Sequence, residues 1–367
     1  QKLQYFTPLQ LKNFNSPGIL YGCMAGMDAW KDAGLPIDEN SATDWDSGTV
    51  FGTGSSSVNK LRESFYKIDA GQVKQLGSTA VVQTMVSGVS AYLSGILGLG
   101  NLVTSNSSAC CTGTEAILMG FERIQSGKAK RMLVGGCSDH GPYIWGGFDA
   151  MKVMSYKHND DPEKASRPMS ATASGFVPGS GAGALMLESL ESALARGANI
   201  YGEISGGSIN AGGQRGSGSM TAPNNEAVQR CIKEAIENAG IQPNDIDLIN
   251  GHLTATVKDA DEVNSWSVAL NRKGNEFPYI HSLKAMTGHC LGAAGAIESV
   301  AAILCLQHNF IFPSINCEDV HPDIAATIDT KKIPQQVLEN NKLQVIAKAS
   351  FGFGDVNTCI IFKKYNG

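Results

Sequence analysis

Two adjacent cysteines, Cys110 and Cys111, are the first candidates for chemistry in this sequence. They follow a short apolar run at residues 101–105, and residues 110–125 have the composition of a helix. Neighbouring cysteines rarely reach disulfide geometry, so no bond between them is expected. At the first turn of a helix, unpaired amides and the helix dipole favour a thiolate. The position predicts that Cys110 is a nucleophile, with a small buried side chain as the alternative.

Two histidines have positions that suit catalysis. His252 follows an apolar run and precedes Thr254 and Thr256, whose hydroxyl groups could bind a polar ligand. His289 precedes a segment rich in glycine and alanine, which we expect to be a helix from about residue 289 to residue 306. A helix N-terminus disfavours the imidazolium ion, so the ring of His289 should be neutral. Either histidine could equally be a structural residue with satisfied hydrogen bonds.

Two charged residues and a glycine-rich turn complete the candidate set. Lys284 and Glu298 lie on either side of His289 and could form an internal ion pair, although solvent exposure is the default for such side chains. Residues 351–354 read Phe-Gly-Phe-Gly, a turn in which glycine would let a backbone amide approach the site. By itself this turn is a weak signal.

The chain alternates predicted strands and helices in two similar series. We expect strands near residues 48–52, 101–105, 131–135, 181–188, 200–206, 246–250, 279–282, 345–349 and 357–363, and helices near 19–30, 81–97, 110–125, 190–196, 225–239, 259–270 and 289–306. In open α/β sheets, ligand groups gather at the carboxyl ends of strands. Cys110, His252 and the turn at 351–354 all follow strands, so we expect them to meet.

Composition narrows the class of protein. The chain has 367 residues, of which 42% are hydrophobic and 17% charged, and its 42 glycines suit a compact α/β protein. A net charge of -5 without a basic run argues against nucleic acid as a partner. The apolar stretches are too short for a membrane span and no signal pattern begins the chain, which predicts a cytoplasmic protein. Nine cysteines without a CxxC pair predict neither a disulfide framework nor a metal site.

Taken in order, several segments resemble the β-ketoacyl synthases of the thiolase superfamily over almost the whole chain. The matching segments are residues 108–113, 160–168, 175–177, 181–183, 220–223, 284–289, 291–298 and 350–354. The set of one cysteine and two histidines resembles the elongating synthases, whereas thiolases use a second cysteine and the initiating synthases an asparagine. The resemblance implies a thiolase-like α/β fold in which two similar βα halves form αβαβα layers. The N-terminal half, 1–197, would carry the cysteine and the C-terminal half, 198–367, both histidines.

The resemblance also implies a role for each residue. Cys110 would take an acyl chain from a carrier thioester, and the amides of Cys110 and Phe353 would form the oxyanion hole. His252 and His289 would hold the malonyl thioester carbonyl, so that loss of carbon dioxide leaves a stabilised enolate. Lys284 would be a further catalytic residue, Glu298 its structural support, Thr254 and Thr256 the binders of the phosphopantetheine arm, and Phe353 an aromatic gate. No metal and no dissociable cofactor are implied.

Some positions depart from the family's usual pattern. Leu253 and Asp355 would add bulk or charge close to the site, and Ser180 stands where the family commonly has an acidic residue. The family's first strand is absent before Gln1, and we expect that strand to be central in its sheet, which implies a missing N-terminal segment.

The resemblance implies an acyl carrier protein as partner and a dimer, either of identical chains or with a related chain-length-factor subunit. We expect residues 102–107 near the dimer interface and the apolar residues of 81–97 beside the acyl pocket. Arg167, Lys128, Lys130 and Arg131 are weak candidates for a patch that receives the acidic carrier. The alternative function is a non-catalytic partner like the chain-length factors. Because those usually lose the nucleophile and this chain keeps Cys110, the enzyme is favoured.

Overall fold

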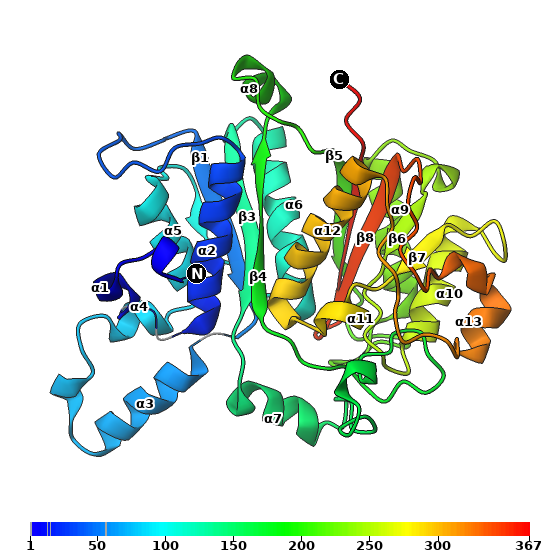
Figure 1. Ribbon diagram of the computed structural model, residues 1–367, viewed down its shortest axis with the longest axis horizontal. Coiled ribbons are helices and arrows are strands. Elements are labelled where there is room, and N and C mark those ends of the chain that lie inside the picture. Colours follow the sequence, from blue (N-terminus) through cyan, green and yellow to red (C-terminus); the bar gives the residue numbers. More distant parts are fainter. Residues whose placement is uncertain (1, 13, 15, 56) are drawn as a thin grey trace.

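The computed structural model describes residues 2–12, 14, 16–55 and 57–367, and these form two β-sheets with helices between and outside them (Figure 1). The first sheet has the order β2 (Val103–Thr104), β1 (Ser47–Thr53), β3 (Arg131–Ser138) and β4 (Gly181–Glu188). The second has the order β5 (Glu203–Ala211), β9 (Val356–Lys363), β8 (Val345–Gly352), β6 (Leu248–Asn250) and β7 (Tyr279–His281). In the first sheet, β4 runs antiparallel to β3 and the other pairs are parallel. In the second sheet, β9 runs antiparallel to both of its neighbours, β5 and β8, and the other pairs are parallel.

The helices form three layers around the sheets (Figure 1). The α-helices are α1 (Pro8–Leu11), α2 (Pro17–Asp32), α3 (Val58–Asp69), α4 (Ala80–Thr84), α5 (Gly88–Leu97), α6 (Thr112–Gln125), α7 (Pro142–Ala150), α8 (Leu190–Ala195), α9 (Asn225–Asn238), α10 (Asp259–Leu270), α11 (Lys284–Thr287), α12 (Ala294–His308) and α13 (Pro322–Thr327). Helices α2 and α5 cover the outer face of the first sheet, α6 and α12 lie between the sheets, and α9 packs on the outer face of the second with α10 beside it. The predicted αβαβα layering is confirmed.

Helix α12 is apolar because it contacts both sheets. Its Ala302, Cys305 and Leu306 are fully buried. The segment Leu291–His308 is long and apolar enough to cross a membrane by composition, yet 61% of it is buried inside the protein. Between the two sheets it therefore serves as a core helix.

Glycines let α12 approach its neighbours. A Cβ atom at Gly113 of α6 would lie 2.5 Å from the backbone nitrogen of Ala296, and one at Gly183 of β4 would lie 2.5 Å from that of Ile297. Both helix and strand thus contact the backbone of α12 directly, which fixes its position between the sheets.

Two predicted helices differ from those in the structure. Residues 81–97 form α4 and α5 instead of one buried helix, because Met85 between them has an extended backbone (φ -72°, ψ 140°). Val81 is 73% exposed, whereas Val89 and Leu93 of α5 are buried. The helix expected from residue 289 begins at Ala294, after a 3₁₀ turn at Leu291–Ala293.

The expectation that a central strand is missing from the first sheet is wrong. Strands β1 and β3 pair directly with each other, from Ser47 opposite Arg131 to Thr53 opposite Cys137. When the two sheets are compared, β4 corresponds to β9, and only β5 lacks a counterpart among the described strands. The outer edge of β4 borders a cavity of about 910 Å³, which is lined by residues 184–188 together with residues of α12 and the start of β5.

Candidate active site

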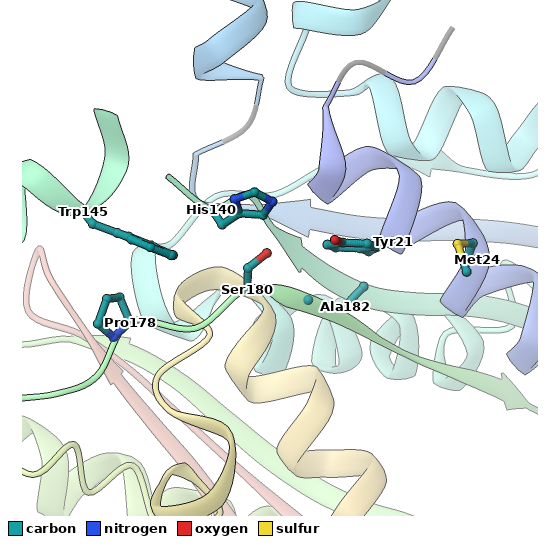
Figure 2. A pocket seen from close by; sticks show the side chains of 8 residues that line it. Tyr21, Met24, His140, Trp145, Pro178, Ser180 and Ala182 are labelled. Atoms are coloured by element: carbon teal, nitrogen blue, oxygen red, sulfur yellow. The ribbon is translucent and has the colours of Figure 1, made fainter. Parts of the chain in front are cut away.

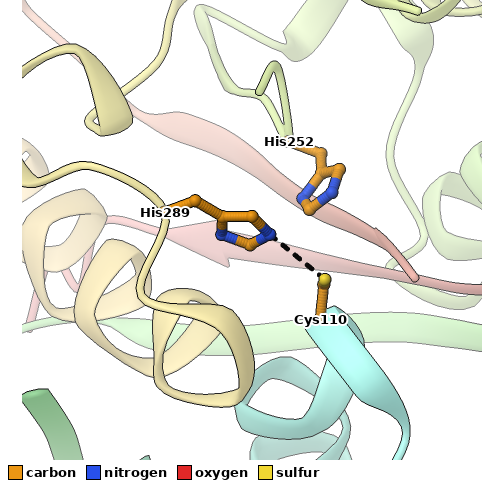
Figure 3. Close-up of side chains that lie close together, drawn as sticks. All are labelled: Cys110, His252 and His289. Carbon is orange, nitrogen blue, oxygen red and sulfur yellow. Dashed lines mark hydrogen bonds between the residues drawn. The ribbon is translucent and has the colours of Figure 1, made fainter. Parts of the chain in front are cut away.

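The two histidines and one cysteine predicted from separate segments lie together (Figure 3). Cys110 Sγ is 3.1 Å from His289 Nε2. One ring nitrogen of His252 joins them, so that the three ligand atoms all lie within 4.8 Å of one another. The two imidazole rings meet edge to face, with centroids 5.4 Å apart. This set suits a nucleophile served by two imidazoles.

A tight turn presents Cys110 to the histidines. Cys110 lies in the 3₁₀ turn Ala109–Cys111, just before α6, and Ala109 has a left-handed backbone with φ 48°. Hydrogen bonds hold the turn: Thr112 Oγ1 accepts from the Ser108 amide at 2.9 Å and donates to the Ala109 carbonyl at 2.7 Å. A non-glycine residue with positive φ at such a position indicates strain held by its surroundings.

Cys111 points away from the histidines. It is fully buried, and its Sγ lies 3.1 Å from the Ser350 carbonyl oxygen and 3.2 Å from that of Val356, to which the thiol donates. Of the two cysteines, only Cys110 faces the imidazoles.

The β8–β9 turn brings a backbone amide to the thiol, as the glycine-rich sequence predicted. The amides of Phe353 and of Cys110 itself both donate towards Cys110 Sγ. Gly352 makes this approach possible, because a Cβ atom there would lie 3.1 Å from the Ser108 carbonyl oxygen and 3.2 Å from the Cys110 nitrogen. Two amides thus converge on the position where an oxyanion would develop in acyl transfer.

The resting site holds neutral groups. Burial raises the pKa of the Cys110 thiol to about 11, although Lys284 and the two amides act in the opposite direction. Burial thus acts against the thiolate expected from the helix dipole, and α6 begins only at Thr112, two residues after Cys110. Burial, followed by the charge of Lys284, also holds the pKa of His252 and of His289 well below the usual range. A neutral His289 can accept the thiol proton at Nε2.

A β-bridge fixes His289, which does not stand at the helix N-terminus where the sequence placed it. The His289 amide donates to the Val177 carbonyl at 2.7 Å, and the Gly179 amide donates to the His289 carbonyl at 2.8 Å. The Phe176 ring packs edge-on against the imidazole, with centroids 5.2 Å apart. The bridge sets the position of the ring, and the aromatic contact limits its rotation.

Two buried carboxylates that sequence reasoning missed hold the His252 loop. Glu262 accepts from the amides of His252 and Leu253, each at 2.7 Å. Asp259 accepts from the amides of Thr254 at 2.9 Å and Ala255 at 3.1 Å. Both acids lie in the first turn of α10, a placement that could have indicated backbone anchors. Burial raises the pKa of Glu262 to about 7.

The threonines expected to bind a substrate arm lie beside His252. Thr254 Oγ1 and Thr256 Oγ1 are 3.1 Å apart, and both residues are half-buried.

The Lys284–Glu298 ion pair predicted from the sequence is confirmed, and a third charged residue joins it. Lys284 Nζ contacts Glu298 Oε1 directly, and both side chains are buried. Lys348 of β8, which sequence reasoning missed, lies with its Nζ 2.9 Å from Glu298 Oε2. The signal was a single lysine within the apolar segment 345–351.

Two departures from the family pattern do not act where we expected. Leu253 is fully buried in the core of the C-terminal half, away from the substrate side of its loop. Asp355 is also fully buried, and its carboxylate accepts from the amides of Gln214 at 2.9 Å and Asn224 at 2.8 Å. Neither adds bulk or charge to the site.

Ser180 lies at the edge of a shallow pocket beside Tyr21 and His140 (Figure 2). Its hydroxyl donates to the Ser138 carbonyl at 2.8 Å.

The four basic residues expected to receive a carrier protein do not form a patch near the site. Arg167 is 8% exposed and paired with Glu318 and Asp319. Lys128, Lys130 and Arg131 lie at the start of β3, while the catalytic groups gather beyond the opposite end of that strand. These positions disfavour a shared basic patch beside the site, and the sequence alone does not give the direction of β3.

Comparisons with known proteins agree with this arrangement. The family model described as "Beta-ketoacyl synthase, N-terminal domain" matches residues 8–193, and "Beta-ketoacyl synthase, C-terminal domain" matches residues 201–318. The 3-oxoacyl-(acyl-carrier-protein) synthase 1 of Haemophilus influenzae is 38% identical over 96% of this chain and 84% of its own length. Its namesake in Escherichia coli strain K12 is 35% identical over 96% and 83%.

Solved structures give the same result. A β-ketoacyl synthase from Burkholderia phymatum superposes with a TM-score of 0.89 at 30% identity, covering 99% of this chain and 85% of that one. A type II polyketide ketosynthase in complex with its acyl-carrier protein superposes with a TM-score of 0.86 at 28% identity, covering 95% and 85%. The chain therefore belongs to the β-ketoacyl synthase family of condensing acyltransferases and has its thiolase-like fold.

Proposed function

We propose that this chain is an elongating β-ketoacyl-(acyl-carrier-protein) synthase of fatty acid, polyene or polyketide synthesis, with Cys110 as the nucleophile. The observation that supports this most directly is the 3.1 Å contact between Cys110 Sγ and His289 Nε2, with His252 in the same cluster. An elongating synthase needs one group to carry the acyl chain and two neutral imidazoles to hold the second substrate.

In the first half-reaction, Cys110 takes the acyl chain. Its thiol proton passes to His289 Nε2 while the sulfur attacks the thioester carbonyl of the acyl carrier. The oxygen becomes an oxyanion between the amides of Cys110 and Phe353. When the intermediate collapses, the carrier's phosphopantetheine sulfur leaves and takes the proton from His289. The site is then ready for the second carrier with its histidines neutral again.

In the second half-reaction, the malonyl thioester carbonyl lies between His252 and His289. Each neutral ring can donate one N–H to this oxygen, which for His289 requires the tautomer with its proton on Nε2 in place of the Nδ1 tautomer that accepts the thiol proton. Breaking of the carboxylate's C–C bond then releases carbon dioxide and leaves an enolate. The enolate carbon attacks the acyl carbonyl on Cys110, and the carbonyl oxygen becomes an oxyanion between the amides of Cys110 and Phe353. When this intermediate collapses, the cysteine sulfur leaves as a thiolate and takes one proton from solvent. The low pKa of both histidines supports this step, because it keeps the two rings neutral while the carbonyl binds.

The phosphopantetheine arm of an acyl carrier protein is assigned to Thr254 and Thr256, whose hydroxyl oxygens lie 3.1 Å apart in the loop that follows His252. Phe353 is assigned as the gate, and its ring lies 6.2 Å from that of Phe148 between centroids. Glu298 supports Lys284 at the base of the site. The proposed reaction uses no metal ion and no cofactor other than the carrier's own arm, and we place it in the cytoplasm.

We further propose a dimer, with an identical or a related subunit. Strand β2 is the outer strand of the first sheet, and its Val103 is 37% exposed. An edge strand with an exposed apolar residue suits pairing with a second subunit.

A chain-length-factor-like partner subunit is the second candidate function, and the retained Cys110 disfavours it. Intact-protein mass spectrometry after incubation with an acyl carrier thioester separates the two. An enzyme gains the mass of one acyl group, and the Cys110→Ala variant gains none. If the wild-type chain gained no mass while a partner subunit did, the chain would be the non-catalytic member of a pair.

A further inference from the structure

A second buried lysine stands behind the catalytic residues. Lys348, on the fully buried strand β8, has 0% of its surface exposed. Its Nζ lies 2.9 Å from Glu298 Oε2 and 3.0 Å from Ser350 Oγ, and it also donates to the Ala349 carbonyl. Lys284 holds the other oxygen of the same carboxylate. One glutamate therefore binds two ammonium groups, and α11, α12 and β8 each contribute one member.

Within this cluster of three, two lysines share one carboxylate, and burial lowers the pKa of Lys348 although Glu298 acts in the opposite direction. Burial of an ammonium group is costly unless it is paired and hydrogen-bonded, and an apolar side chain would fill the same space in a buried strand at less cost. Lys284 alone could neutralise Glu298. A role in packing or in balancing charge thus leaves Lys348 unexplained.

The contacts of Lys348 lead to both sides of the reaction site. On one side, Glu298 and Lys284 lie in the segments that flank His289. On the other, Ser350 Oγ is 2.8 Å from Thr114 Oγ1 of α6, the helix that follows Cys110. Beyond Ser350, β8 ends at Gly352, and the next amide is that of Phe353.

We propose that Lys348 is a positioning residue of the condensing site: its ammonium group joins the Lys284–Glu298 pair to β8 and so fixes the Phe353 amide relative to Cys110 and His289. The inference rests on the proposed function and deepens it. Lys348 does not touch substrate in this account. It sets the distance between the oxyanion hole and the histidines.

The same charge has an electrostatic consequence. The titratable groups that lie around the two histidines are Cys110 from the 3₁₀ turn, Glu262 from α10, Lys284 from α11 and Lys348 from β8. Glu298 from α12 and His281 from β7 lie around the two lysines. Burial is the main cause of the low pKa of His252 and of His289, and the positive charges of Lys284 and Lys348 lower it further. Loss of the Lys348 charge should let both rings take up a proton at higher pH.

The test compares Lys348→Met, which keeps the length of the side chain, with Lys364→Met as the matched control. Lys364 is a half-buried lysine that donates to Asn309 at 2.8 Å, after the end of β9 remote from the site. We expect Lys348→Met to lower kcat for condensation by about 10- to 100-fold with little change in KM for the carrier substrates. Its activity should also fall off at higher pH than that of the wild type, on the acid side of the profile. Lys364→Met should change neither.

Titration of the histidine ring protons by NMR tests the proposal without substrates, so its failure is distinguishable from failure of the proposed function. In the wild type, the signals assigned to His252 and His289 should titrate well below pH 6.5. In Lys348→Met, the same signals should titrate at a higher pH than they do in the wild type. If Lys348→Met does not fold, Lys348→Gln replaces it, because the amide keeps a hydrogen bond without the charge. Histidine titration and kcat unchanged within about twofold in the folded variant would overturn the proposal.

Discussion

Single residues decide how the nucleophile is formed, and the two cysteines differ in what they contact. Cys110→Ala should abolish acylation while the fold is kept, because a small residue replaces a small one at the turn. Cys111→Ala should retain acylation and lower the free energy of unfolding by about 1–2 kcal/mol, since it removes a buried thiol that donates to Ser350 and Val356. Intact mass and thermal denaturation measure the two effects. A Cys110→Ala protein acylated at Cys111 would contradict the assignment.

The histidines should also separate by half-reaction. His289 accepts the thiol proton in this account, and the thiol has a pKa of about 11, so His289→Ala should slow acylation and decarboxylation, each by about 100-fold or more. The amides of Cys110 and Phe353 still favour the thiolate, so some acylation should remain. His252→Ala should leave acylation near the wild-type rate and lose decarboxylation. Acyl-enzyme mass and carbon dioxide release follow the two steps, and equal loss of acylation in both variants would show that His252 also serves the thiol.

The residues that sequence could and could not predict differ in what their roles depend on. Cys110, His252 and the turn at 351–354 follow strands, and strand ends gather at one edge of a sheet, so their meeting was predictable. The roles of Asp259 and Lys348 were not predicted from the sequence, because each depends on contacts with another segment. Asp259 holds the backbone of the His252 loop, and Lys348 pairs with Glu298. Arg167 was predicted to be a surface contact, but it is buried and paired with Glu318 and Asp319. The sequence around Arg167 gave no sign of these two partners.

Among the elements, the position of α12 depends on contacts that only glycine allows. Gly113→Ala should lower the melting temperature by several degrees and slow acylation, because the new methyl group would meet the α12 backbone near the His289 segment. Gly95→Ala in α5 is the matched control, since nothing lies within 4 Å of its Cβ position and alanine favours a helix. Differential scanning calorimetry with an acylation assay makes the comparison. Equal behaviour of the two variants would show that α12 tolerates displacement.

Strand and helix positions were predicted well where hydrophobic period and length agreed, as in β4 and α10, whose predicted bounds match the structure. The helix expected over 81–97 breaks at Met85, where no proline marks the change. The direct pairing of β1 with β3 was also not predictable. Sheet order depends on pairing between distant segments, and the sequence carries no direct record of that pairing.

At the scale of the whole molecule, stability should depend on pH through buried His281. Burial lowers the pKa of His281 from 6.5 to about 4, so between these values the unfolded chain binds a proton that the folded protein does not. This stabilisation is present above pH 6.5 and is lost as pH falls towards 4, by up to about 3 kcal/mol. Glu262, whose pKa is raised from 4.5 to about 7, has the opposite effect. Its contribution to the stability of the fold is present below pH 4.5 and is lost as pH rises towards 7.

The variant His281→Leu isolates the histidine's share. Its free energy of unfolding in urea should fall less than that of the wild type between pH 6.5 and pH 4. Parallel pH profiles for the two proteins would mean that His281 is protonated in the folded state or exposed by local opening.

Condensation itself gives the most direct test of the whole account. The purified chain would be mixed with an acyl carrier thioester and a malonyl carrier thioester labelled with ¹³C in the carbons that are kept, and the carrier-bound product would be weighed. We expect a β-ketoacyl product longer by two labelled carbons, one carbon dioxide released for each product, and neither from Cys110→Ala. Product formed at the wild-type rate by Cys110→Ala, or acylated Cys110 that never condenses in the presence of malonyl carrier, would contradict it.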